Sequence, residues 1–121
     1  MKRVLAPTLA IAALVSLNAQ SPGERAVDWN RLRPEILERY RDLVKLDTTA
    51  GGETLAVDYL KKVLESEGIP TSTFALDPKR ANLVARLKGN GSKRPLLILA
   101  HTDVVGVQRE KWPVDPFGAV M

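Results

Sequence analysis

An apolar run that ends in the chain's only histidine constrains the fold of this sequence more than any other feature. The run, Leu96–Ala100, lies between Pro95 and the polar triplet His101-Thr102-Asp103. A short, continuous apolar run is typical of a strand buried on both faces, as in a parallel sheet covered by helices. We therefore expect a buried strand here, with the triplet at its carboxyl end, where ligands bind in open α/β sheets.

The two ionisable residues of this triplet are two positions apart, so an extended backbone places both side chains on one side. Alone, His101 is more often a hydrogen-bonded structural residue than a metal ligand, and Asp103 could simply cap a turn. Together they favour a metal site, because a ligating imidazole usually needs a carboxylate or carbonyl to orient it. They do not complete one: catalytic zinc typically takes three protein ligands, and the sequence has no second histidine and no cysteine.

Apolar periodicity upstream of the run predicts two helices. The first covers about residues 34–46, with Pro34 near its first turn, where a missing N–H costs little. The second runs through residues 55–64 and is closed by Gly68 as a C-terminal cap. Their charged residues lie mostly opposite the apolar ones and indicate solvated surfaces.

Two further strands are expected between the second helix and the apolar run. Residues 71–76 alternate β-branched and aromatic side chains, and residues 82–87 follow the turn at 77–79. The tight polar turn at residues 89–92 favours antiparallel pairing of 82–87 with the apolar run. The predicted fold class is therefore α/β, with helices packed on a mixed β-sheet.

The amino terminus has the order of a secretory signal peptide. A basic start is followed by an apolar stretch, Val4–Leu17, and by a small residue, Ala19, before Gln20. We expect residues 1–19 to be a cleaved signal peptide, residues 20–33 a flexible lead, and the protein to be exported to the periplasm or the extracellular space. A membrane anchor is disfavoured because the apolar stretch is short for a bilayer span, so no stable anchor remains after cleavage.

Charge and cysteine content exclude some classes of function and stabilisation. Without Lys2 and Arg3 the 18 basic residues become 16, against 14 acidic ones, a net charge of +2. The basic residues are scattered among acids, so a nucleic-acid partner is not expected. With no cysteine, an exported chain cannot use disulfides and must rely on core packing.

A proline-rich loop follows the polar triplet and has an aromatic residue at each end, Trp112 and Phe117. Two alternatives are equally weighted at this point. The aromatics could pin the loop to the body of the fold, or the loop could form a wall of a cleft.

Two segments together closely resemble the first metal-binding segment of a known family. They are Leu97–Val105 and Trp112–Phe117, which carry His-Thr-Asp-Val-Val and a Trp-to-Phe motif. The family is the aminoacylase/carboxypeptidase family of di-zinc metallopeptidases, peptidase family M20. The likeness extends upstream through residues 53–70 and 80–89.

The resemblance implies that His101 is a ligand of one of two zinc ions. It also implies that Asp103 is a catalytic aspartate that supports the metal-site groups without ligating the metal. The expected substrates are peptides, cleaved at the carboxyl terminus, or N-acyl amino acids, and the complete protein could be a homodimer.

The family's remaining ligands, its general base and its lid and dimerisation domain have no counterpart in this sequence. We therefore expect residues 34–121 to be the incomplete amino-terminal part of a metallopeptidase catalytic domain, inactive alone. The alternative is a noncatalytic exported α/β module that serves as a binding or interaction unit.

Overall fold

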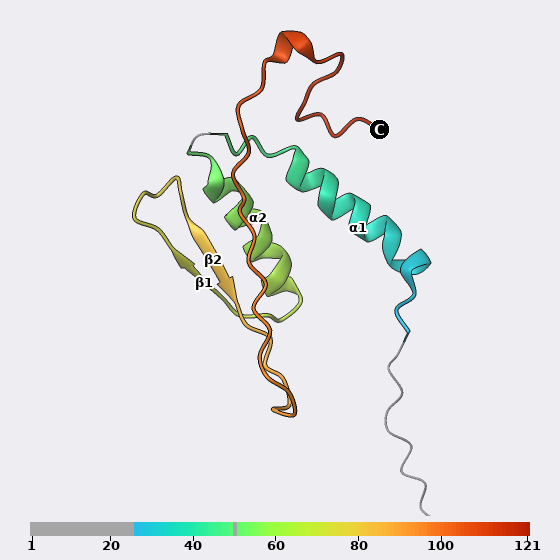
Figure 1. Cartoon of the computed structure of the whole chain (residues 1–121), viewed down its shortest axis with the longest axis vertical. Helices are drawn as coiled ribbons and strands as arrows, with labels where there is room; N and C mark the ends of the chain where they lie inside the picture. Colours follow the sequence, from blue (N-terminus) through green and yellow to red (C-terminus); the bar gives the residue numbers. More distant parts are fainter. Residues whose placement is uncertain (1–25, 50) are drawn as a thin grey trace, which may run out of the picture.

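The computed structural model describes residues 26–49 and 51–121, and these form a small α/β unit (Figure 1). The elements in chain order are α1 (Trp29–Val44), α2 (Glu53–Ser66), β1 (Thr71–Phe74), β2 (Asn82–Ala85) and a 3-10 turn, η1 (Arg109–Lys111). The predicted signal peptide, residues 1–19, lies outside the described residues. Within them, no helix combines the length and the apolar character needed to cross a membrane.

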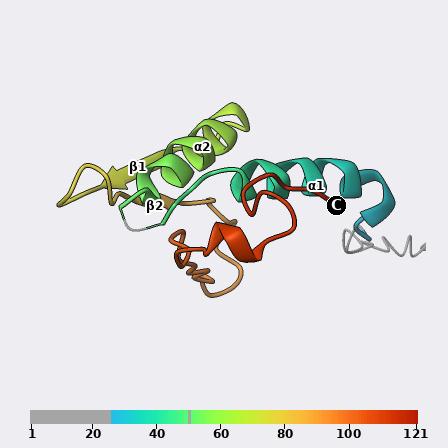
Figure 2. The ribbon, with the colours of Figure 1, turned by 90° about the horizontal axis from the view of Figure 1, so that it is seen from above.

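Helix α1 begins earlier than the periodicity predicts. The Asp28 side chain accepts a hydrogen bond from the Arg31 N–H at 3.1 Å, which satisfies one of the free donors of the first turn. Residues 29–33, expected in the lead, are therefore helical, and Pro34 lies inside the helix. Helix α1 buries no side chain, and Figures 1 and 2 show it extending to one side of α2 and the sheet.

Helix α2 ends at Ser66, and Gly68 closes it as predicted. This glycine has a φ of +73°, a conformation that costs residues with a Cβ but not glycine. Its N–H donates to the Glu65 carbonyl at 3.0 Å, and the Ile69 N–H donates to the Leu64 carbonyl at 2.9 Å. These two bonds form a Schellman motif, which satisfies carbonyls that the helix end leaves free.

Strands β1 and β2 form a two-stranded antiparallel sheet in which Thr71 is opposite Ala85 and Phe74 is opposite Asn82. Both predicted strands are thus confirmed over shorter lengths. Helix α2 packs against both strands. Among residues 26–49 and 51–121, the buried apolar side chains are few: Ala56, Val57 and Ala81.

The hydroxyl of Thr54, in the first turn of α2, holds the turn between the strands. It donates to the Pro78 carbonyl at 2.7 Å and accepts from the Ala81 N–H at 3.1 Å. The start of the helix and the tip of the hairpin are thereby joined in one small packed unit.

The expectation of a strand buried on both faces at Leu96–Ala100 is wrong. The segment is in no ladder, and Leu96 to Leu99 are each 83–88% exposed. A strand of the parallel type is buried by flanking strands and by helices on both faces. Within residues 26–49 and 51–121, β1 and β2 pair only with each other, so the flanking strands that would cover the apolar run are not present.

The predicted pairing of residues 82–87 with the apolar run is also wrong, and the observed sheet is antiparallel rather than mixed. The chain does reverse where the turn was expected, with Gly91 at a φ of +80° and the Ser92 N–H bound to the Asn90 side chain at 3.0 Å. In Figure 1 the chain then runs back past α2 toward the carboxyl-terminal loop.

Candidate metal centre

His101 and Asp103 are brought together as their spacing predicts. The His101 Nδ1 lies 3.0 Å from the backbone oxygen of Asp103 and 3.1 Å from its Oδ1. Both neighbours are acceptors, so the contact requires a proton on Nδ1 that is donated to them. In the neutral ring, this tautomer leaves the lone pair of Nε2 free for a metal. A carboxylate or carbonyl on the second ring nitrogen is the usual support of a ligating histidine.

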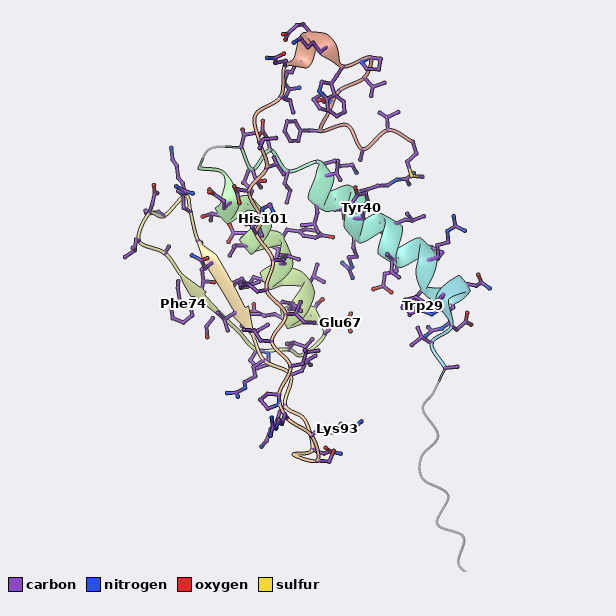
Figure 3. The ribbon with its side chains drawn as sticks, viewed as in Figure 1. Trp29, Tyr40, Glu67, Phe74, Lys93 and His101 are labelled. Carbon is purple, nitrogen blue, oxygen red and sulfur yellow. The ribbon has the colours of Figure 1, made fainter. Side chains whose placement is uncertain are left out.

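The imidazole is open to solvent. The side chain of His101 is 85% exposed and that of Asp103 is 57% exposed, and Figure 3 places His101 near the amino-terminal turn of α2. Among the described residues, no group of three or more His, Asp or Glu side chains is placed to hold a metal ion. The pair therefore fits one zinc ligand with its supporting carboxylate, and these residues do not supply the three protein ligands of a catalytic site.

A buried threonine attaches this segment to the loop before α2. The Thr48 hydroxyl, on a residue only 3% exposed, donates to the backbone oxygen of Thr102 at 2.7 Å. The same loop approaches the helix closely at Gly52, where a Cβ would lie 2.5 Å from the Asp47 carbonyl oxygen. Sequence reasoning missed Thr48, because a single threonine in a polar loop carries no periodic or motif signal.

Asp103 also lines an open cavity of about 530 Å³ at the start of α2. Its other lining residues are Gly51, Glu53, Asp77, Lys79 and Arg80. Glu53 is 7% exposed; its Oε1 accepts from the Arg80 Nε at 2.9 Å, whereas its Oε2 is buried without a partner among the described residues. Carboxylates and cations thus meet beside Asp103, which suits a polar ligand that carries charge.

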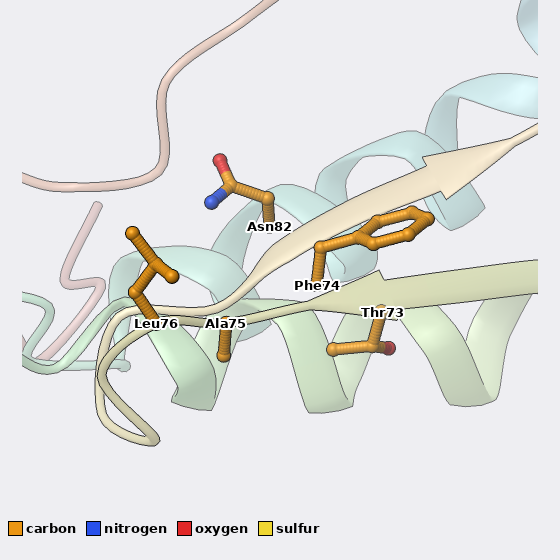
Figure 4. Close-up of a pocket in the computed structure, with 5 residues that line it drawn as sticks. All are labelled: Thr73, Phe74, Ala75, Leu76 and Asn82. Carbon is orange, nitrogen blue, oxygen red and sulfur yellow. The ribbon is translucent and has the colours of Figure 1, made fainter.

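A second cavity, of about 440 Å³, lies at the end of β1 and the start of β2 (Figure 4). Its lining residues are Thr73, Phe74, Ala75, Leu76 and Asn82. None of these side chains is ionisable, and neither His101 nor Asp103 is among them. This cavity therefore has no part in the candidate metal centre.

Arg109 organises the carboxyl-terminal loop. Its guanidinium lies 2.9 Å from Asp115 and 3.9 Å from Asp47, and it stacks 5.4 Å from the centroid of the Phe117 ring. Trp112 is 51% exposed. Of the two alternatives for this loop, attachment to the body is observed in the ion pair of Arg109 with Asp47, and Phe117 lies against Arg109 within the loop. The loop lines neither cavity.

Asp47, which faces Arg109, belongs to the loop that holds the metal-centre segment. The Thr49 hydroxyl donates to its carboxylate at 2.6 Å and the Thr49 N–H at 3.1 Å. These hydrogen bonds lower the pKa of Asp47 below its ordinary value of 3.8, and the positive charge of Arg109 adds to the effect.

Comparison with curated proteins shows a distant, partial similarity to succinyl-diaminopimelate desuccinylase, a hydrolase of family M20. The protein of Staphylococcus aureus strain Mu50 named "Probable succinyl-diaminopimelate desuccinylase" is 34% identical over 85 residues, 69% of this chain and 20% of that protein. The protein of the same name in Staphylococcus epidermidis strain RP62A is 35% identical over 78 residues, 63% of this chain and 18% of that protein. This chain thus spans about one fifth of the length of these relatives. No family model matches it, and no solved structure matches it with significance.

Proposed function

We propose that the chain is the amino-terminal part of a zinc-dependent amidohydrolase of the M20 type, in which His101 binds one zinc through Nε2 and Asp103 supports it. The observation that carries this proposal is the contact of His101 Nδ1 with two acceptor oxygens of Asp103. The partial similarity to desuccinylases favours the same class of reaction.

In the whole protein, the substrate would be an N-acyl amino acid or the carboxyl-terminal part of a peptide, both of which place an anionic carboxylate near the amide. Zinc would supply Lewis-acid polarisation of the amide carbonyl. The residues of this chain would contribute orientation: the Asp103 oxygens hold the proton on Nδ1 and fix the ring plane of His101.

Zinc titration of the 121-residue chain tests this assignment, followed by isothermal titration calorimetry in all variants and, where His101 is present, also through its ring signals by NMR. We expect weak binding that His101→Ala abolishes and that Asp103→Asn weakens about 10- to 100-fold. Zinc binding that is unchanged in His101→Ala would contradict the metal centre and favour a noncatalytic binding module.

We propose also that the protein is exported, on the basis of the basic, apolar and small-residue order of residues 1–19. Expression in a bacterium with the native start should give a product outside the cytoplasm that begins at Gln20. An intact mass that retains Met1 in the exported fraction would contradict cleavage.

A further inference from the structure

We propose that Thr48 is a positioning residue for the metal centre, an assignment that rests on the proposed function of His101 and Asp103. The Thr48 hydroxyl donates to the backbone oxygen of Thr102, the residue between them, at 2.7 Å. The two partners are 54 residues apart in the chain, so this bond attaches the metal-centre segment to a distant loop.

Thr48 is suited to this task because its own position is well determined. Thr48 is 3% exposed, whereas the side chains of His101 and Asp103, which it would position, are largely open to solvent. Its neighbours Asp47 and Thr49 are joined by the two hydrogen bonds to the Asp47 carboxylate. The hydroxyl is therefore presented from a constrained loop toward a segment that lacks ladder hydrogen bonds of its own.

The bond acts on Asp103 through the peptide plane. The Thr102 carbonyl is coplanar with the Cα of Asp103, because the peptide group is rigid. Holding that oxygen restricts the plane from which Asp103 extends. The two Asp103 oxygens that face His101 Nδ1 still depend on the φ, ψ and χ1 angles of Asp103, so the bond narrows their directions by fixing one end of that residue. The direction of the free Nε2 follows from the orientation of the ring, so Thr48 acts on the ligand without touching it.

A purely structural role is the ordinary explanation of a buried hydroxyl that is hydrogen bonded. The two roles differ in what changes when the hydroxyl is removed. A structural role predicts a loss of stability with no specific change at residues 101–103. A positioning role predicts local loosening of these residues and weaker zinc binding, both restored by serine.

The experiment uses the 121-residue chain and three variants. Thr48→Val keeps the shape and removes the hydroxyl, and Thr48→Ser retains the hydroxyl. Thr73→Val makes the same exchange at an exposed position of β1, away from the loop of Thr48 and from residues 101–103. Circular dichroism reports the helices α1 and α2, and backbone ¹⁵N relaxation of the metal-free protein reports the order of residues 101–104. Zinc affinity is then measured through the ring signals of His101.

In Thr48→Val we expect lower heteronuclear NOE values at residues 101–104 and a zinc dissociation constant raised about two- to tenfold, the equivalent of one lost hydrogen bond. Thr48→Ser and Thr73→Val should resemble the wild type. Unchanged relaxation in Thr48→Val, or a loss in Thr48→Ser as large as that in Thr48→Val, would overturn the assignment. Thr48→Ala replaces Thr48→Val, with the same two outcomes, if the valine variant loses its helical signal.

The zinc affinities of the variants separate failure of this inference from failure of the proposed function. If His101→Ala abolishes zinc binding while Thr48→Val leaves the affinity unchanged, the metal centre stands and the role of Thr48 is overturned. If zinc binding persists in His101→Ala, the proposed metal centre fails, and the relaxation of the metal-free variants decides alone whether Thr48 orders the segment.

Discussion

The unit formed by residues 53–85 and the segment 95–121 differ in how each is held. In the first, α2 packs on both strands, Val57 is 1% exposed, and the hairpin pairs its own backbone groups. In the second, the apolar run is exposed and residues 95–108 form neither helix nor strand. The second is attached to the rest of the chain by the Thr48 hydroxyl, which binds the Thr102 carbonyl, and by the ion pair of Arg109 with Asp47.

This difference shows that apolar character alone does not bury a segment. The hairpin and α2 are close in sequence, so their contacts form at a small cost in loop closure. The apolar run Leu96–Ala100 needs partners on both edges and both faces, which adjacent sequence does not provide. The candidate metal centre consequently lies on the less constrained of the two regions, and a few polar contacts determine its geometry.

The largest expected effect contrasts a buried and an exposed apolar residue. Val57→Asp places an unpaired charge in the small core and should cost about 4 kcal/mol or more, enough to unfold the unit. Leu97→Asp, at a site 83% exposed, should change the unfolding free energy by less than about 0.5 kcal/mol. Urea denaturation followed by circular dichroism measures both; equal losses would show that the apolar run is buried in solution.

The next effect tests the backbone within the packed unit. Gly68→Ala forces a residue with a Cβ into a φ of +73° and should destabilise the unit by about 1–2 kcal/mol. Gly89 is the matched control: a Cβ at either glycine meets no atom within 4 Å, but the φ of Gly89 lies outside the left-handed region. Gly89→Ala should therefore shift the urea midpoint little, and a shift as large as that of Gly68→Ala would mean that the region after β2 is as constrained as the end of α2.

A smaller effect is expected from the attachment of the carboxyl-terminal loop. Arg109→Ala removes exposed ion pairs and a ring contact, which together contribute about 1 kcal/mol or less. Amide exchange at residues 109–118 should accelerate while exchange in α2 stays unchanged. Arg94→Ala serves as the control because Arg94 takes no part in these contacts. Faster amide exchange at residues 109–118 in Arg94→Ala as well would point to a general effect of lost charge.

The smallest effect concerns the pH dependence of the attachment. Because the pKa of Asp47 is lowered in the folded state, its contribution to stability is present above its ordinary value of 3.8 and is lost as pH falls through the lower folded value. Thr49→Val removes the hydroxyl that is the largest cause and should raise this pKa toward 3.8. The pKa of Asp47 is measured from the ¹³C chemical shift of its carboxyl group as a function of pH. An unchanged titration midpoint of Asp47 in Thr49→Val would mean that the loop is not held as observed.

Local elements were the most predictable part of the fold. Helix periodicity and the Gly68 cap placed α2, and the alternation in residues 71–76 and 82–87 placed both strands, because each signal depends on neighbours in sequence. The start of α1 was missed because the cap at Asp28 outweighed the proline signal at Pro34. The pairing of the apolar run was wrong because a strand partner is a tertiary choice, and β1 lies closer to β2 in the chain.

At the candidate site, the sequence by itself determined that His101 and Asp103 would lie together, since a spacing of two on an extended backbone places both side chains on one side. Only the tertiary structure decided that both Asp103 oxygens face Nδ1, that Thr48 holds the carbonyl between the pair, and that Glu53 and Arg80 meet beside Asp103. These contacts join residues 27 to 54 positions apart, or depend on the rotation of single side chains. Periodicity and spacing describe near neighbours, whereas contacts of this kind arise only when the chain has folded.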